Sequence, residues 1–343
     1  MDNLFFLSAI AAIISFLITP LVRKLAFKFK AVDIPRGGRK IHKVTMPRWG
    51  GISIYVSFIV VILIKNGDVN IKEWGIVLGA FIILIGGMLD DRFELRPHQK
   101  LIFQLLASIV VIAMGLKIEV LTNPLSIIDP SISIGPILSI PMTIIWIIGI
   151  TNALNLMDGL DGLSAGISLI SCLTIMIISI MKDNIGSALI TAILSGSIIG
   201  FLPYNFHPAS IFLGDTGAQL LGFLLATISI EGAVKSAAAF AIVVPILTMA
   251  LPIFDTLFAI IRRKINGKPI SEGDRGHMHH RLLDMGFTQK QAVMVMYLIS
   301  AVLSGIAVIA IQMNSTASYV LLFVVTLIIA LVCWKLGFFK RQQ

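Results

Sequence analysis

Apolar runs of about 17–20 residues, separated by short polar segments, follow one another along the whole chain. Each run is long enough to cross a bilayer as a helix. The pattern therefore predicts an all-α integral membrane protein, a polytopic bundle of about eleven transmembrane helices. The expected spans are residues 3–21, 50–65, 74–89, 100–116, 136–151, 164–181, 187–203, 213–230, 237–261, 292–311 and 317–335. No long polar segment remains for a second domain, so residues 1–343 are predicted to form a single transmembrane domain.

Local signals refine two of these spans and one segment between spans. The second span is expected to begin at Gly50-Gly51, and Pro252 is expected to bend the ninth. Between the spans, residues 117–135 combine β-branched side chains with Pro and Asn turns, a composition that favours a small hairpin.

The composition supports a membrane protein. Of the 343 residues, 57% are hydrophobic and only 13% are charged, which is too apolar for a soluble globular domain. The first apolar run is long, follows Asp2 and lacks a basic n-region and an A-x-A cleavage site. These features indicate an uncleaved first helix with its N-terminus outside.

Positive charge is distributed unevenly between the two sides of the predicted bundle. If the loops alternate, one side carries 22 of the 27 Lys and Arg residues, and that side is therefore expected to be cytoplasmic. The C-terminus falls on it too, in a multi-pass protein of the cell membrane. This bias accounts for most of the net charge of +9, and the basic segments lack the interleaved aromatic residues of a nucleic-acid-binding module. Nucleic acid is therefore not an expected partner.

The two cysteines, Cys172 and Cys333, lie inside apolar segments. Packing between helices is the favoured interpretation for both, over a disulfide or a metal site.

Four groups of polar residues lie at the ends of apolar segments, all on the predicted cytoplasmic side. The first is Asp90-Asp91, which closes the third span, with Lys100 shortly after it. Adjacent carboxylates repel each other and favour a bound cation or a basic partner. A solvated helix end is the ordinary alternative.

The second group consists of Asn and Asp residues that recur every three residues. Gly159 and Gly162 favour a loop from Asp158 onward rather than a continuous helix. Such a loop can offer carboxylates and backbone N–H groups together, which suits a sugar nucleotide or a magnesium-bound phosphate. An Asp-Gly turn between helices is the simpler alternative. A calcium loop is not supported, because this segment lacks the terminal bidentate Glu that such a loop requires. The group consists of Asn152, Asn155, Asp158 and Asp161.

The third group is the sequence NFHPASIFLGDTG, at the mouth of the eighth span. Asp215 lies among Gly and Thr residues there, and such an oxygen ligand suits Mg²⁺. Phe212 could stack on a base, although a core or lipid-facing role is the more common one for a phenylalanine. No G-x-x-x-x-G-K-[ST] sequence is present, which excludes a P-loop nucleotidase.

The fourth group is EGDRGHMHHR, which contains Asp274, His277, His279 and His280. Adjacent histidines suit one tetrahedral zinc ion poorly, and no cysteine is nearby. Cationic and hydrogen-bonding contacts to a diphosphate fit this group better.

Together these motifs resemble the polyprenyl-phosphate N-acetylhexosamine-1-phosphate transferases (glycosyltransferase family 4). The similar stretches run from about residue 40 to about residue 290, with DD, NxxNxxDGxDGLS, FLGDTG and HxHHR in the family's order. HMHHR and the eleven spans resemble the GlcNAc-1-phosphate branch. IHKVTMPRWGG and HMHHRLLDMGF are most similar to enzymes that initiate wall teichoic acid synthesis, with O-antigen initiators as further relatives.

The resemblance implies a role for each motif residue. Asp215 corresponds to the Mg²⁺ ligand, and Asp90 and Asp91 to the pair near the lipid phosphate, with Asp90 as the proposed base. The other implied catalytic residues are Asp158, Asp161 and His279. The implied substrate-binding residues are Lys43, Arg48, Lys100, Asn152, Asn155, Asn205, Phe212, His277, His280 and Arg281.

The implied reaction is transfer of GlcNAc-1-phosphate from UDP-GlcNAc to undecaprenyl phosphate with release of UMP, at the cytoplasmic face. It would be the first membrane step of a cell-envelope polysaccharide such as teichoic acid or lipopolysaccharide. Mg²⁺ is the expected cofactor, with Mn²⁺ as a substitute, and a homodimer is a possible assembly. The alternatives are another UDP-N-acetylhexosamine or UDP-MurNAc-pentapeptide as donor, and, from a different class, an ion-coupled transporter.

Overall fold

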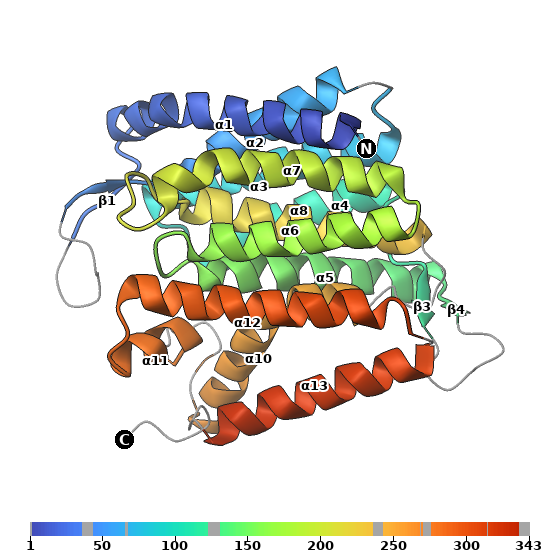
Figure 1. Ribbon diagram of the computed structural model, residues 1–343. Coiled ribbons are helices and arrows are strands. Elements are labelled where there is room, and N and C mark those ends of the chain that lie inside the picture. Colours follow the sequence, from blue (N-terminus) through green and yellow to red (C-terminus); the bar gives the residue numbers. More distant parts are fainter. Residues whose placement is uncertain are drawn as a thin grey trace.

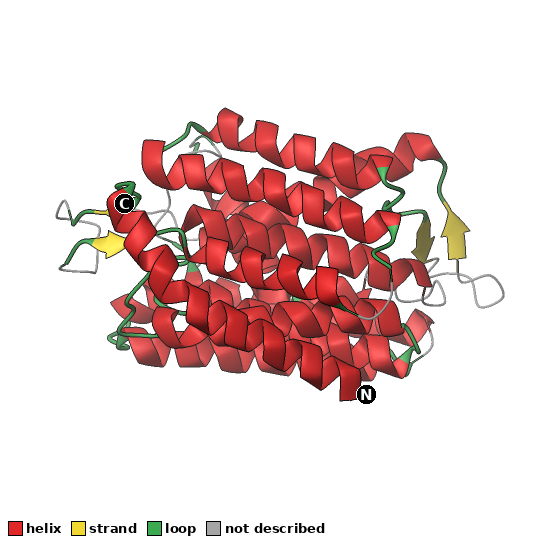
Figure 2. Ribbon diagram, turned by 90° about the horizontal axis from the view of Figure 1, so that it is seen from above, coloured by secondary structure: helices red, strands yellow, loops and turns green. Residues whose placement is uncertain are grey.

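The computed structural model describes residues 2–35, 44–65, 68–122, 131–235, 243–267, 269, 276–313 and 315–335. Long helices lie side by side between two ends of the molecule, as Figures 1 and 2 show, and the predicted all-α class is confirmed. In chain order the elements are α1 (Asp2–Lys28), β1 (Val32–Asp33), β2 (Met46–Pro47), α2 (Gly50–Ile64), α3 (Ile71–Phe93), α4 (Pro97–Ala113), β3 (Val120–Thr122), β4 (Ser131–Ser133), α5 (Pro136–Met157), α6 (Leu163–Met181), α7 (Ile185–Asn205), α8 (Gly214–Lys235), α9 (Val243–Thr248), α10 (Ala250–Ile265), α11 (Met278–Asp284), α12 (Gln289–Ala310) and α13 (Ser315–Lys335).

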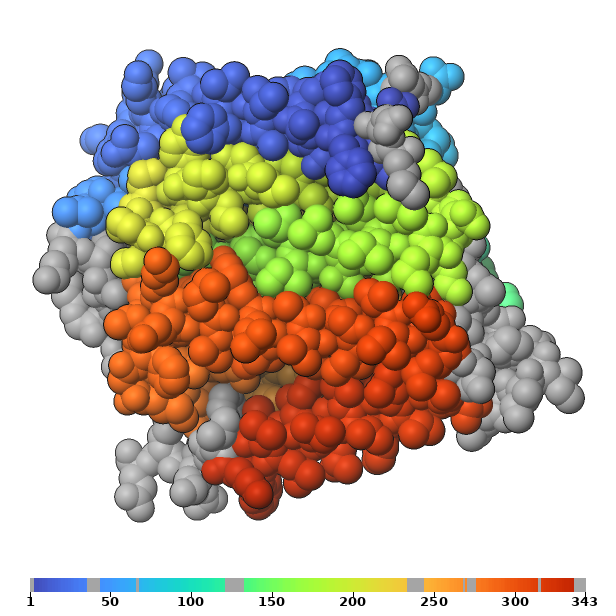
Figure 3. All heavy atoms as spheres, viewed as in Figure 1, coloured from blue at the N-terminus to red at the C-terminus, as the bar shows by residue number. Residues whose placement is uncertain are grey.

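The helices have the length and surface of a membrane protein. Within the described residues, seven helices are long and apolar enough to cross a bilayer, namely α1, α3, α5, α6, α7, α12 and α13, and α2 and α4 are shorter apolar helices. In the space-filling view α1, α7, α6, α12 and α13 form successive bands across one face (Figure 3). Large apolar side chains are exposed on its outermost helices, among them Phe5 on α1 and Phe323 on α13. The predicted count of eleven spans, and their orientation, stay predictions.

The expected ninth span is interrupted. Its described part consists of two helices, α9 and α10, which are separated at Met249 rather than bent at Pro252. Pro252 lies in the first turn of α10, where its missing N–H group costs no intrahelical hydrogen bond.

Two short hairpins lie at opposite ends of the bundle (Figure 1). The hairpin predicted within residues 117–135 is present, because β3 pairs with β4 in antiparallel register. The other hairpin, β1 with β2, was not predicted, since each of its strands has only two residues.

Helix α8 forms the centre of the core, and it begins in close contact with two neighbours. A Cβ built on Gly51 of α2 would lie 2.4 Å from the Cα of Gly217, and one built on Gly87 of α3 would lie 2.4 Å from the Cα of Thr216. Small residues let helix backbones approach in this way. The first turn of α8 is therefore fixed between α2 and α3.

One end of the bundle gathers the described residues of the predicted motifs. The C-terminal ends of α3, α5 and α7 meet the N-terminal ends of α4, α6 and α8 there, at the left of Figure 1. We call it the motif end.

Candidate functional site

Asp91 caps the first turn of α8. Its Oδ1 accepts the N–H of Asp215 at 2.9 Å, and its Oδ2 accepts the N–H of Thr216 at 3.0 Å and the Thr216 hydroxyl at 2.5 Å. Gly214 is required beside this contact, because its φ is +70° and an added Cβ would lie 2.5 Å from Asp91 Oδ2. A carboxylate at a helix N-terminus is favourable because free N–H groups point toward it. Asp91 therefore fixes the backbone that carries Asp215.

Lys100 joins the other two acidic groups of this cluster. Its ammonium pairs with Oδ2 of Asp90 and with Oδ2 of Asp215. Asp90 also accepts the N–H of Leu95 at 2.7 Å through Oδ1. The side chains of Lys100 and Asp215 are 24% and 30% exposed, whereas Asp90 is buried. Lys100 and Asp215 are thus the more exposed members of the cluster.

The turn between α5 and α6 carries Asp158 and Asp161, as predicted from its glycines. Helix α5 ends at Met157, and Asp158 follows it as the C-cap. Burial, together with the negative charges of Asp91 and Asp161, raises the pKa of Asp158 to about 8, against the opposing effect of the Arg48 guanidinium. Asp158 therefore lies close enough to Asp91 for their charges to interact.

Asp161 connects this turn to the segment between α7 and α8. Its Oδ2 accepts the N–H of Ala209 at 3.1 Å and lies 2.8 Å from Nδ1 of His207. The ring of His207, which the sequence analysis did not single out, lies at the exposed edge of the site.

The asparagines of the motifs differ in their surroundings. Asn155 Oδ1 and Asn205 Oδ1 are buried and have no hydrogen-bond partner among the described residues, although Nδ2 of Asn205 donates to the Ile211 carbonyl at 3.1 Å. Asn152 instead donates to Gln104 Oε1 at 2.8 Å, and Gln104 donates to Gln219 Oε1 at 3.0 Å. A buried acceptor without a partner is costly, so Asn155 and Asn205 are suited to a ligand N–H or O–H.

The FLGDTG motif contacts the β1–β2 hairpin. The N–H of Phe212 donates to the Pro47 carbonyl at 2.8 Å, and the Phe212 carbonyl accepts the N–H of Gly50 at 3.1 Å. Arg48, which follows Pro47 in sequence, forms a salt bridge of 3.2 Å with Asp33. Lys43 lies outside the described residues.

The histidine motif forms α11 and its N-cap. His277 is buried, with Nδ1 2.7 Å from Oδ2 of Asp255, and Arg281 donates from Nε to the Gly276 carbonyl at 3.2 Å. His279 is buried too, and its ring centroid lies 4.2 Å from that of His280. Burial and, to a smaller extent, the neighbouring His280 lower the pKa of His279 to about 3, so His279 is a neutral imidazole near pH 7. Asp274 lies outside the described residues.

His279 meets the aspartate turn directly. A Cβ built on Gly159 would lie 2.3 Å from His279 Nε2, so only glycine allows this approach. The turn and α11, about 120 residues apart in sequence, therefore form one surface.

Sequence reasoning missed several polar residues of the site, all inside or next to apolar segments. Asp255 carried a usable signal, because an acidic residue inside an expected span is costly and usually has a specific role. Gln104 and Gln219 carried a weaker one, as amides in apolar runs, and His207 had only its place in a motif to indicate it.

The arrangement combines groups suited to phosphoryl chemistry. The motif end carries carboxylates, an ammonium and a neutral imidazole that can donate or accept a hydrogen bond. Buried amide oxygens suited to a ligand lie beside them. The individual catalytic and substrate-binding roles given from the sequence stay predictions.

Comparison with known proteins gives the same family as the motifs. The sequence model of glycosyl transferase family 4 matches residues 73–233. A probable undecaprenyl-phosphate N-acetylglucosaminyl 1-phosphate transferase of Bacillus subtilis is 39% identical over 91% of this chain and 86% of its own. A decaprenyl-phosphate N-acetylglucosaminephosphotransferase of Mycolicibacterium smegmatis is 32% identical over 84% and 77%. An undecaprenyl-phosphate alpha-N-acetylglucosaminyl 1-phosphate transferase of Yersinia pestis is 27% identical over 88% and 82%. The chain belongs to glycosyl transferase family 4.

Proposed function

We propose that this protein transfers GlcNAc-1-phosphate from UDP-GlcNAc to undecaprenyl phosphate and releases UMP, at the cytoplasmic face of the cell membrane. The observation that carries the proposal is the gathering of Asp90, Asp91, Asp215 and Lys100 at one end of an apolar bundle. The names of the similar proteins support the same donor sugar and a polyprenyl phosphate acceptor. In this reaction an oxygen of the lipid phosphate attacks the β-phosphorus of the donor, and UMP leaves with the bridging oxygen.

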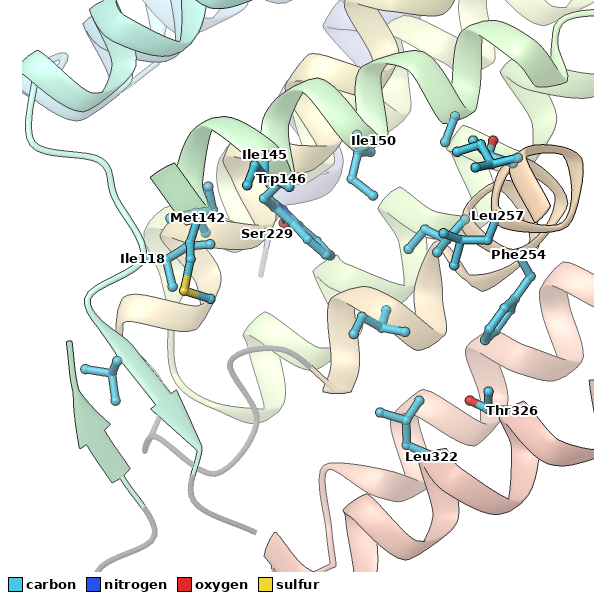
Figure 4. A pocket seen from close by; sticks show the side chains of 18 of the residues that line it. Ile118, Met142, Ile145, Trp146, Ile150, Ser229, Phe254, Leu257, Leu322 and Thr326 are labelled. Atoms are coloured by element: carbon cyan, nitrogen blue, oxygen red, sulfur yellow. Dashed lines mark hydrogen bonds between the residues drawn. The ribbon is translucent and has the colours of Figure 1, made fainter. Parts of the chain in front are cut away.

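The acceptor's prenyl chain has a suitable place in the bundle. A cavity of about 670 Å³ lies between α5, α8, α9, α10 and α13, and almost all of its lining is apolar (Figure 4). Trp146 and Ile150 line it on α5, Leu257 on α10 and Leu322 on α13. Ala153, also in the lining, lies five residues before Asp158, or about 7.5 Å along the helix axis. A chain in this cavity would bring its phosphate to the aspartate turn.

The donor is assigned to the turn and to the segment before α8. The buried oxygens of Asn155 and Asn205 offer acceptors to N–H or O–H groups of the nucleotide sugar. Phe212 is the proposed platform for uracil, on the strength of the family resemblance. His279, neutral and adjacent to Gly159, is the proposed hydrogen-bond donor to the diphosphate.

Mg²⁺ is the proposed cofactor. This ion usually binds one or two carboxylates and completes its shell with water and substrate phosphates. Asp215 fits that description, because its part-exposed Oδ2 already binds one cation, the Lys100 ammonium. Among the described residues no group of three His, Cys, Asp or Glu side chains is arranged for a metal, so the remaining ligands would be water and substrate. When bound, the ion would polarise the diphosphate and stabilise the charge on UMP.

The chain's own groups divide the remaining chemistry. Asp90 is the proposed base that takes the proton of the lipid phosphate. Lys100, once the substrates are present, can turn from the carboxylates to a phosphate oxygen. Two polyanions meet in this reaction, so neutralisation of charge is the main requirement.

An ion-coupled transporter is less consistent with the site. Transporters place their ionisable residues near the bilayer midplane, on broken helices. The motif acids here lie at helix ends, and Asp90 and Asp215 lie in the last and first turns of their helices.

The test uses purified protein with undecaprenyl phosphate and a panel of UDP-sugars, and it reads UMP release and the mass of the lipid product. UDP-GlcNAc is expected to be turned over with a divalent cation, and Asp215→Asn is expected to lower turnover by at least about two orders of magnitude. Turnover of UDP-MurNAc-pentapeptide with no use of UDP-GlcNAc would show that the donor is wrong. Near-normal turnover by Asp215→Asn with unchanged cation dependence would exclude Asp215 as the metal ligand.

A further inference from the structure

Helix α11 depends on a carboxylate from another helix. It has only seven residues, and none of its own side chains caps it. Asp255 of α10 supplies the cap, because its Oδ1 accepts the N–H of Met278 at 2.9 Å. Its other oxygen holds the ring of His277 at 2.7 Å. A helix this short is unstable alone, so these contacts determine where α11 lies.

The contacts of Asp255 lead on to the site. The ring of His277 stacks nearly parallel on that of His279, with an interplanar angle of 9° and centroids 5.9 Å apart. His279 in turn lies against Gly159 in the aspartate turn. The residue is only 2% exposed, and its buried Nδ1 has no hydrogen-bond partner among the described residues. A polar atom in that state is suited to a ligand.

We propose that Asp255 is a positioning residue for the nucleotide-sugar diphosphate: through His277 and the N-terminus of α11 it holds the His279 ring at the aspartate turn. The inference rests on the proposed function, in which His279 contacts the diphosphate. Asp255 itself touches no substrate, since it is buried beneath α11 with both oxygens bonded to that helix and its N-cap.

A purely structural role would not need this chemistry. A buried carboxylate is costly to desolvate, and it persists only where hydrogen bonds offset that cost. Apolar packing is already available at this point, because Met278 belongs to two apolar clusters that include Leu282 and Phe258. What the carboxylate adds is direction, since it fixes both the ring of His277 and the first N–H group of α11.

The test is a double-mutant cycle on nucleotide binding. The affinity of the full-length protein in detergent for UDP, with Mg²⁺ present, is measured calorimetrically for the wild type, Asp255→Ala, His279→Ala and the double variant. Each single variant is expected to bind UDP at least about tenfold more weakly, which corresponds to the lower end of the range for one lost hydrogen bond to a charged group. The double variant is expected to bind no more than about twofold more weakly than His279→Ala alone, because both changes remove the same contact.

Two further variants separate positioning from folding. Asp255→Asn keeps the shape and the acceptor for Met278 N–H, so it is expected to fold and to lose less affinity than Asp255→Ala. It also serves in the same cycle if Asp255→Ala does not fold. Asp284→Asn removes the same charge from an exposed position of α11 and is expected to bind UDP as the wild type does.

The outcomes are distinct from those of the transfer assay. Additive losses in the cycle, or unchanged UDP affinity in Asp255→Ala, would overturn the positioning role even if GlcNAc-1-phosphate transfer is found. Conversely, wild-type protein that binds UDP but transfers no sugar phosphate would refute the proposed function, while coupling between Asp255 and His279 in UDP binding would still support the positioning.

Discussion

The two adjacent aspartates at the end of α3 should differ sharply when each is replaced by asparagine. Asp91→Asn keeps one acceptor oxygen and replaces the other by an NH₂ group that cannot accept. If the amide oxygen takes the place of Oδ1, the Thr216 N–H and hydroxyl lose their acceptor. Hydrogen bonds to a charged group contribute about 1.5–3 kcal/mol each, so the loss is about 3–6 kcal/mol. At about 2 °C per kcal/mol for a large chain, Asp91→Asn should lower the melting temperature by about 6–12 °C.

Asp90→Asn is the matched control. Asp90 accepts one backbone N–H, from Leu95, which an amide oxygen can still accept, and its other partner is the part-exposed Lys100. Because Lys100 keeps Asp215 as a partner, the melting temperature should stay within about 2 °C of the wild type, or about 1 kcal/mol, while turnover is crippled. The assay is a thermal melt of purified protein in detergent, alongside UMP release. Equal melting temperatures for the two variants would refute the assignment of Asp91 as the cap of α8.

Three other predictions follow from the site and the topology. Gly159→Ala should displace His279 and weaken UDP binding about tenfold with little change in melting temperature, as measured by calorimetry and a thermal melt, because the new Cβ would lie 2.3 Å from Nε2. The pKa of Asp158 is about 8 in the folded protein against an ordinary value of 3.8, so the unfolded chain loses its proton first and stability falls as the pH rises from about 4 to about 8. Asp158→Asn removes that penalty and should raise the melting temperature more at pH 8 than at pH 5; an equal change at both would contradict the sign. Cysteines introduced near Lys65 and near Lys268 should be labelled from opposite sides of the membrane, and labelling of both from one side would exclude the eleven-span topology.

The sequence indicated most of the helices and the place of the motifs, because both are local signals. A long apolar run defines a helix by itself, and Gly159 and Gly162 marked the turn after α5. The alternation of loops then put Asp90, Asp158 and Asp215 on one side without any knowledge of contacts. In the structure, the helix ends that hold these residues lie at one end of the bundle.

The partners of those residues could not be predicted, because they are set by packing between distant segments. Asp91 as the cap of α8 depends on α3 and α8 lying in contact, which 124 residues of separation conceal. The same holds for Asp255, whose partner His277 belongs to another element. The break at Met249 was misplaced to Pro252, since a proline in sequence does not reveal whether it bends a helix or begins the next one.

The central claim is that a sugar phosphate, and not a sugar alone, passes to the lipid at the motif end. UDP-GlcNAc labelled at the β-phosphate tests it most directly, with purified protein, undecaprenyl phosphate and Mg²⁺. We expect the label in the organic phase with the lipid and unlabelled UMP in the aqueous phase, and loss of both products in Asp215→Asn. Label that remains in the aqueous phase as UDP, with sugar on the lipid, would contradict the account.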